Sequence, residues 1–274
     1  MQSGVENPQL LSRDWKRLAS DELEVVGNAS EKDLRSALKE VQRFRATLLA
    51  LIPGLTTASH QKTILVVLRD TNSFQRFLPR DGRGRKQENV AGYFLVQPYA
   101  NVMVLPMFAD RDATFRVAFH EYTHYLVYRN MPNLPLWLNE GIADLYSTFS
   151  VDAEGRSVIG RAPPWYVAAL QKRPIIPLSR FLDPETGSRL FENDVDTSLF
   201  YAQAWAFVHF MTLADKGKRR GQILRYLEAL ETAPSRIEAA ARKHFTWVKE
   251  RGDRNYTEYG LARAELKRLE GATP

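Results

Sequence analysis

The sequence of 274 residues contains no cysteine. Disulfide bonds, thiolate nucleophiles and Cys-ligated metal sites are therefore excluded. A protein without cysteine is compatible with an oxidising or a reducing compartment, so its compartment is not indicated. No apolar run approaches the roughly 20 residues that cross a membrane, so no membrane span is expected. Residues 1–8 are polar and lack the apolar segment of a secretory signal, so these residues do not indicate a compartment.

The sequence also has little excess charge of either sign. Lys and Arg number 38 against 32 Asp and Glu, for a net charge of +6, and 44% of the residues are hydrophobic. This balance is typical of a globular protein. A basic run, residues 80–86, is expected to be a solvated loop, because neither interleaved aromatics nor a nucleic-acid motif accompanies it. We therefore expect no nucleic-acid partner, and composition leaves the oligomeric state open.

The N-terminal half combines strand patterns with helices. Ser30, followed by Asp33, predicts a helix start, and Pro53-Gly54 predicts its end. The apolar stripe expected on this helix consists of Leu34, Leu38, Val41, Phe44 and Leu48. A short helix is expected over residues 72–78. Strands are expected at residues 23–27, at 63–68 (buried on both faces), and at 91–97 and 101–106, which are joined around residues 98–99.

The C-terminal half is mainly helical. Helices are predicted at residues 112–129, 136–148, 197–214, 221–231, 234–243 and 256–269, with a turn at 152–155 between two short strands. The fold class is therefore α+β: a small mixed sheet with helices, then a mainly helical half, with helix 112–129 between them. We expect residues 1–20 to be an extension. Residues 21–274 should be one domain, with lobes of about 21–130 and 131–274.

Residues 120–124 have the sequence HEYTH. On a helix, His120 and His124 are slightly more than one turn apart, so both imidazoles leave the same face and can meet one zinc ion. Glu121 lies one step round the helix, where it can act as general base and take a proton from a metal-bound water. The run predicts a catalytic zinc site.

A catalytic zinc needs three protein ligands and an open position. The helix expected from residue 136 supplies Glu140 as third ligand. Asp144 lies one turn further on the same face and is the candidate acceptor for the second N–H of a ligating histidine. Gly141 and Ala143 are small, so we expect this helix to approach helix 112–129 closely.

These motifs, HExxH followed by Glu-x-x-x-Asp, resemble those of the gluzincins, the group that contains thermolysin and the M1-type aminopeptidases. The bacterial peptidase MA-like proteins are more similar still, with runs like residues 119–124, 134–141, 91–94 and 201–205. The resemblance covers most of residues 20–215. It implies one zinc ion per chain on His120, His124 and Glu140, and Glu121 as general base. Because the interval to Glu140 is shorter than in thermolysin, the loop between the helices must be compact.

Peptide hydrolysis also needs a donor for the tetrahedral oxyanion. Tyr201, on a strongly apolar helix, is our candidate, since gluzincins often place Tyr or His there from a downstream helix. The alternative is a core tyrosine. His209, on the same helix, is a weaker alternative donor or a core histidine. His60 and His244 have no motif around them and are expected at the surface.

Strand 91–97 is a candidate edge of a substrate cleft, where Gly92 and Tyr93 would bind an extended peptide through the main chain. An ordinary hairpin strand is the alternative. The expected function is zinc-dependent hydrolysis of a peptide or protein substrate by an endopeptidase. An aminopeptidase and a catalytically silent peptide-binding protein are the alternatives. The family resemblance favours an exported (periplasmic or secreted) bacterial protein over a cytoplasmic one.

Overall fold

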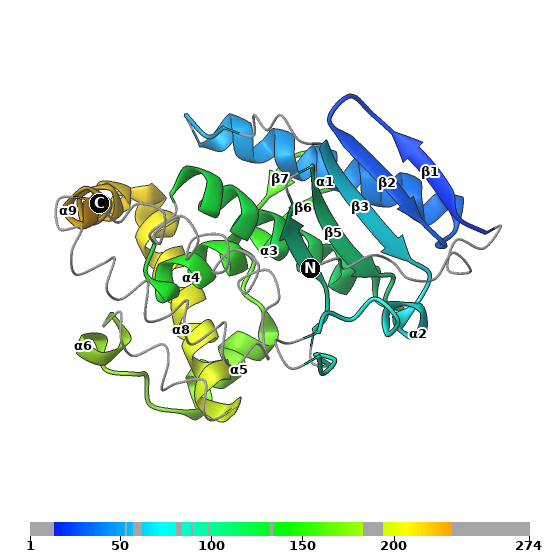
Figure 1. Ribbon diagram of the computed structural model, residues 1–274. Helices are drawn as coiled ribbons and strands as arrows, with labels where there is room; N and C mark the ends of the chain where they lie inside the picture. The colour runs from blue at the N-terminus through cyan, green and yellow to red at the C-terminus, as the bar shows by residue number, and fades with distance from the viewer. Residues whose placement is uncertain are drawn as a thin grey trace, which may run out of the picture.

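The computed structural model describes residues 14–52, 54–56, 62–80, 84–88, 90–97, 99–131, 134–182 and 194–231. A mixed sheet occupies one side of the molecule and a group of helices the other, with a long helix between them (Figure 1). This arrangement confirms the α+β class. In the described residues, no helix is both long and apolar enough to cross a membrane.

The main sheet has five strands in the order β1-β2-β3-β5-β4. Its three central strands are parallel, and the edge strands β1 and β4 are antiparallel to their neighbours. Residues 16–19, which we expected in an N-terminal extension, form β1 and pair with β2, so the sheet begins before residue 21. The strand bounds are β1 (Lys16–Ala19), β2 (Leu23–Gly27), β3 (Lys62–Leu68), β4 (Tyr93–Val96) and β5 (Ala100–Pro106).

Helix α1 (Glu31–Leu51) covers one face of the sheet. Its start was predicted correctly, because the Ser30 side chain accepts a hydrogen bond from the Asp33 backbone N–H at 3.2 Å. The predicted stripe also faces the core, although Leu38 is only partly buried. Full burial of β3 on both faces was a wrong prediction: its residues alternate between buried and partly exposed up to residue 66.

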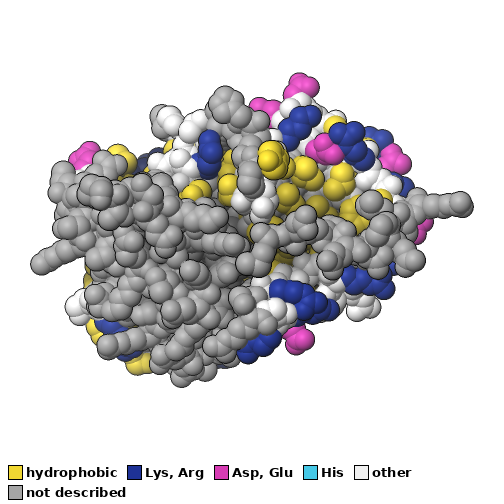
Figure 2. Space-filling model, in the orientation of Figure 1, with side chains coloured by type: hydrophobic (Ala, Val, Ile, Leu, Met, Phe, Trp, Pro, Cys, Tyr) yellow, Lys and Arg dark blue, Asp and Glu magenta, His cyan; other side chains and the backbone are white. Residues whose placement is uncertain are grey.

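The other face of the sheet is apolar but only partly covered. Figure 2 shows hydrophobic side chains over the sheet with charged side chains around them. Val66, Leu95 and Val102 lie partly buried there, beside Trp15 and Phe77. Helix α2 (Thr71–Phe74) packs on the same side and is shorter than the expected helix at 72–78, because the chain turns after Phe74.

The basic run was expected to form a loop. Its ends, Arg80 and Lys86, form an isolated antiparallel bridge, and the Arg80 side chain donates to the Gly84 carbonyl at 2.7 Å. Residues 81–83 lie outside the described part of the chain. The described ends of the run are thus held close together.

Helix α3 (Arg111–Asn130) lies between the sheet and the helical part (Figure 1). Phe119, Tyr122 and Leu126 recur at helical spacing and lie in the core against the sheet and α1. Tyr125 accepts a hydrogen bond from the Asn101 side chain of β5 at 3.0 Å. One face of α3 is therefore fixed to the sheet, which leaves another face for the histidines.

The helical part has its own apolar core around Trp137, Leu138, Phe181 and Phe200. The short strands predicted around residues 152–155 are present as β6 and β7. The helices predicted at 234–243 and 256–269 lie outside the described residues. The elements of this part are α4 (Leu136–Ser147), β6 (Ser150–Val151), β7 (Ser157–Val158), α5 (Pro164–Lys172), α6 (Leu178–Phe181), α8 (Asp194–Thr212), η2 (Ala214–Gly217) and α9 (Arg220–Glu231).

Gly141 serves a different contact from the one expected. A Cβ atom at this position would lie 2.5 Å from Val208 Cγ2 and 2.6 Å from the Ala204 carbonyl oxygen, both in α8. Gly141 therefore lets α4 approach α8 rather than α3. The approach holds α4 between α3 and α8.

Candidate metal centre

Three side chains from two helices meet at one point. His120 and His124 lie one turn apart on α3, and their Nε2 atoms are 2.9 Å from each other. Glu140, near the start of α4, places Oε2 3.6 Å from each of these nitrogens. The three ligand atoms lie within 4.8 Å of one another, so this group could hold a metal ion. The sequence predicted all three residues.

The chemistry of the donors fits a divalent transition metal. Two imidazole nitrogens and one carboxylate oxygen are common ligands of such ions, and three protein ligands leave a position open. Glu140 is fully buried and His124 is nearly so. A buried carboxylate is costly unless a positive charge lies beside it, and a bound cation would supply that charge.

The electrostatics of His120 also favour a cation. Burial lowers the pKa of this ring, but the hydrogen bond and charge of Asp144, with the charges of Glu140 and Glu121, outweigh burial and raise the pKa to about 10. The carboxylates thus stabilise positive charge at the ring. At neutral pH a metal ion would displace a proton from His120 on binding.

Both histidines are held by residues of α4. Asp144 Oδ1 lies 3.1 Å from His120 Nδ1, as the sequence predicted for the second N–H. Asn139 Oδ1 lies 3.2 Å from His124 Nδ1, a contact that the sequence analysis missed. With these acceptors on Nδ1, each ring keeps Nε2 directed at the ligand group.

Tyr166, at the start of α5, was also missed. Its hydroxyl donates to Asp144 Oδ2 at 2.7 Å. Burial, followed by the charge and hydrogen bond of Asp144, keeps the pKa of Tyr166 well above its usual value, so the hydroxyl remains a donor. Asp144 therefore uses one oxygen for His120 and the other for Tyr166. No motif marked Tyr166, since its partner lies 22 residues earlier in the chain.

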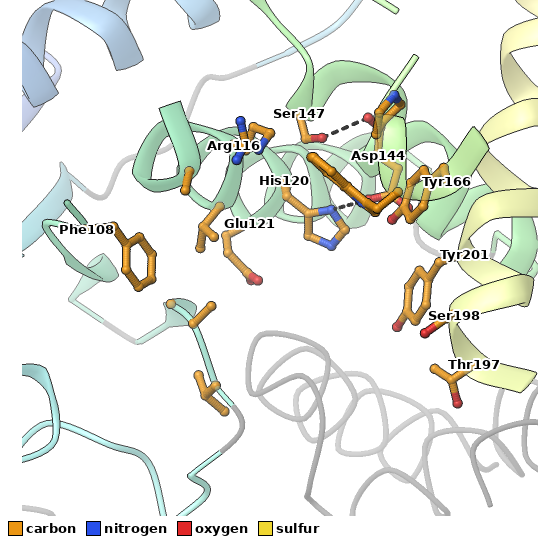
Figure 3. A pocket seen from close by; sticks show the side chains of 17 residues that line it. Phe108, Arg116, His120, Glu121, Asp144, Ser147, Tyr166, Thr197, Ser198 and Tyr201 are labelled. Atoms are coloured by element: carbon orange, nitrogen blue, oxygen red, sulfur yellow. Dashed lines mark hydrogen bonds and ion pairs between the residues drawn. The ribbon is translucent and has the colours of Figure 1, made fainter. Parts of the chain in front are cut away.

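Of the three candidate metal ligands, His120 lines a cavity of about 810 Å³. His120, Glu121 and Asp144 line it from α3 and α4, and Tyr201 lines it from α8. In Figure 3 the Glu121 carboxylate and the Tyr201 ring both point into this cavity, on either side of His120. The structure thus brings the predicted general base and the predicted oxyanion donor to the same space.

Other candidates lie differently. Gly92 lines the cavity just before β4, and a Cβ atom there would be 2.7 Å from Val117 of α3. The Tyr93 side chain is instead buried against Phe74 and donates to the Phe77 carbonyl at 2.7 Å, so it does not line the cavity. His209 packs against Trp205 and is likewise absent from the cavity lining.

His60 and His244 lie outside the described residues. Neither a model of a known protein family nor a curated protein matches this chain. The geometry alone shows a buried group able to hold a metal, two supported histidines, and an acidic residue beside them in an open cavity. Such a site can activate water or polarise a carbonyl group.

Proposed function

We propose that this protein is a zinc-dependent peptidase, and that it cleaves within peptide chains. The observation that carries the proposal is the meeting of His120, His124 and Glu140 next to a cavity into which Glu121 points. When bound, zinc supplies Lewis-acid activation of water and of the scissile carbonyl. The family resemblance of the HExxH and Glu-x-x-x-Asp runs agrees with this function.

Side chains of the protein carry out the remaining steps of the reaction. Glu121 takes the proton of the attacking water and passes it to the departing amine, since its carboxylate faces the cavity beside His120. Tyr201 donates its hydroxyl to the oxyanion that develops on the former carbonyl. Asp144 keeps His120 in one orientation throughout the cycle.

Strand β4 is the proposed edge for the substrate. It forms one edge of the sheet, and the residues before it, Ala91 and Gly92, line the cavity. An extended peptide could pair with such an edge through its main chain, so the β4 side chains need not contact it. The buried Tyr93 would then contribute only its backbone.

Endopeptidase activity is favoured over aminopeptidase activity. An aminopeptidase needs acidic groups to hold the free amine of its substrate. In the described lining of the cavity, the acidic residues are Glu121 and Asp144, and Asp144 is engaged by His120 and Tyr166. A catalytically silent binding protein would have no need of Glu121 in this position.

The metal assignment is tested by elemental analysis of purified protein dialysed against zinc. We expect about one zinc per chain, and its loss in His120→Ala and in His124→Ala, because each variant leaves only two ligands. The control is Arg35→Gln on α1, which is outside the site and should keep the metal. Wild-type protein without zinc would contradict the assignment.

The activity is tested with a peptide library and mass spectrometry of the products. We expect Glu121→Gln to keep the zinc and to lose at least about 100-fold in kcat/KM, since the amide cannot accept the proton. Glu40→Gln, on the far helix α1, is the matched control. Internal cleavage would support an endopeptidase, and removal of N-terminal residues an aminopeptidase. An unaffected Glu121→Gln variant would refute the role of this residue, and a zinc-loaded protein that cleaves nothing would refute the function.

A further inference from the structure

A cationic residue and an exposed aromatic ring lie together in the cavity wall. Arg116 of α3 and Trp165 of α5 both line the cavity, and the Arg116 guanidinium carbon is 5.1 Å from the centre of the Trp165 ring. Trp165 is 52% exposed, so its ring is not part of the packed core and can be reached from the cavity. The roles assigned to the metal site do not require this pair.

The pair is close to the metal ligands. Arg116 precedes His120 by four residues on α3, so both leave the same face of the helix, about 6 Å apart along its axis. Figure 3 places Arg116 and His120 on the same helix above the cavity. An extended peptide advances about 3.3–3.6 Å per residue. The attachment points of the two side chains are therefore about two peptide residues apart, and we take this spacing as the expected separation between a group bound at Arg116 and the bond cleaved at the metal.

The guanidinium is held in a way that leaves donors for a ligand. The Arg116 guanidinium carbon lies over the Trp165 ring, and this attraction between cation and ring requires no directed N–H donor. Among the described acidic residues, one forms an ion pair with the guanidinium: Arg116 Nη2 lies 3.3 Å from Asp110 Oδ2, and 61% of the Asp110 side chain is exposed. An ion pair of this length with a mostly exposed carboxylate is weak and leaves most of the five donors for another carboxylate.

We propose that Arg116, whose guanidinium lies over the Trp165 ring, binds a carboxylate of the substrate within two residues of the scissile bond. The inference rests on the proposed peptidase function and adds a substrate preference to it. The carboxylate belongs either to an internal Asp or Glu or to the C-terminus of the peptide. Planar guanidinium binds both in the same bidentate way, so the chemistry is common to the two sources.

The first experiment measures kcat/KM for matched peptides. A peptide that the protein cleaves is made with Glu or Gln at each of the two positions on either side of the cleaved bond, and with a free or an amidated C-terminus. We expect one carboxylate to raise kcat/KM about 10- to 100-fold over its amide counterpart. In Arg116→Gln this ratio should fall towards 1, and in Arg116→Lys it should recover in part.

The position of the effective carboxylate decides its source: Glu over Gln indicates a side chain, and free acid over amide indicates the C-terminus. Arg35→Gln, an exposed arginine of α1, is the control and should keep the wild-type ratio. Trp165→Ala should lower the ratio of kcat/KM values about 3- to 10-fold, because the guanidinium loses its cation–π interaction with the indole ring. Equal kcat/KM for every carboxylate and amide pair would overturn the proposal.

The second experiment separates this proposal from the proposed function. Library peptides are made in pairs that differ only by Glu for Gln or by a free for an amidated C-terminus, and their binding to the Glu121→Gln protein is measured by calorimetry, with and without Arg116→Gln. A carboxylate preference in Kd that disappears with Arg116 supports the proposal even if no peptide is cleaved. Peptides that bind without such a preference, or do not bind at all, overturn it. If the protein cleaves neutral peptides and shows no preference for a carboxylate, the peptidase function stands and the role of Arg116 is refuted.

Discussion

At the scale of the residue, Asp144 does the most to organise the site. One of its oxygens accepts from His120 and the other from Tyr166, so the carboxylate is held between two elements besides its own. A carboxylate on Nδ1 fixes the orientation of a ligating ring and raises the basicity of Nε2. Asp144 would therefore act on a bound metal through His120.

The first prediction concerns this carboxylate. Asp144→Asn keeps the shape of the side chain but removes its charge, so we expect metal affinity to fall about 10- to 100-fold. Titration of the metal-free protein with zinc against a competing chelator measures the change. Asp21→Asn, at an exposed position outside the site, is the control. Equal zinc affinity in Asp144→Asn and wild type would mean that Asp144 does not support His120.

At the scale of the element, helix α4 makes close contacts on two sides, with α3 and with α8. Towards α3 it presents Asn139, Glu140 and Asp144 to the two histidines. Towards α8 it presents Gly141, which lies against the backbone of Ala204. The position of Glu140 therefore depends on a close contact made by the next residue in the chain.

The second prediction tests that contact. Gly141→Ala would place its methyl group 2.6 Å from a backbone oxygen, which cannot rotate away, so α4 or α8 must move. We expect a loss of about 1–3 kcal/mol in the free energy of unfolding, measured with urea. We also expect weaker zinc binding, because Glu140 moves with α4.

Gly221→Ala is the matched control for this change. Gly221 also lies in a helix, and the nearest atom to a Cβ there, Arg225 Nη1, is 3.6 Å away and mobile. Alanine favours helix over glycine, so this variant should be neutral or more stable by up to about 1 kcal/mol. If both variants had the same effect, close packing of α4 on α8 would not explain the glycine.

Local patterns sufficed to predict most elements. The cap at Ser30, the stripe of α1 and the length of α4 depend on neighbours along the chain, and the structure agrees with them. Strand β1 was missed because its four residues, KRLA, are mostly exposed and show no apolar alternation. The order of the strands, and hence β4 at the edge, depends on long-range pairing, which no local pattern contains.

The residues of the site also fall into those that local spacing predicts and those that depend on long-range packing. His120, His124 and Glu140 could be predicted because helical spacing and the chemistry of zinc constrain them strongly. Asn139, directly before Glu140, was within reach, since a polar side chain at a buried helix start suggests a partner. Tyr166 was not within reach, because its contact with Asp144 depends on how α5 packs against α8.

At the scale of the whole molecule, the ligand group connects two cores. His120 and His124 belong to α3, which packs on the sheet and α1, while Glu140 belongs to α4 in the helical core. Ile159, between β7 and α5, touches both cores. A metal bound by all three ligands would add a strong contact between the two parts.

The third prediction follows from that connection. An ion that binds the folded state alone, at 1,000 times its Kd, stabilises it by about 4 kcal/mol. For a domain of this size we expect zinc to raise Tm by roughly 10 °C, measured by calorimetry of metal-free and zinc-loaded protein. His120→Ala is the control and should show little change. A zinc-loaded wild type with the Tm of the metal-free protein would contradict this prediction.

Helix α4 carries a metal ligand together with the acceptors that hold both histidines. These contacts are made by one rigid segment, so they must be lost or kept together. A movement of α4 away from α3 would therefore disturb the ligand and both supports at once. The close contact of Gly141 with α8 opposes such a movement. A bound ion and the packing of α4 on α8 should therefore stabilise one another.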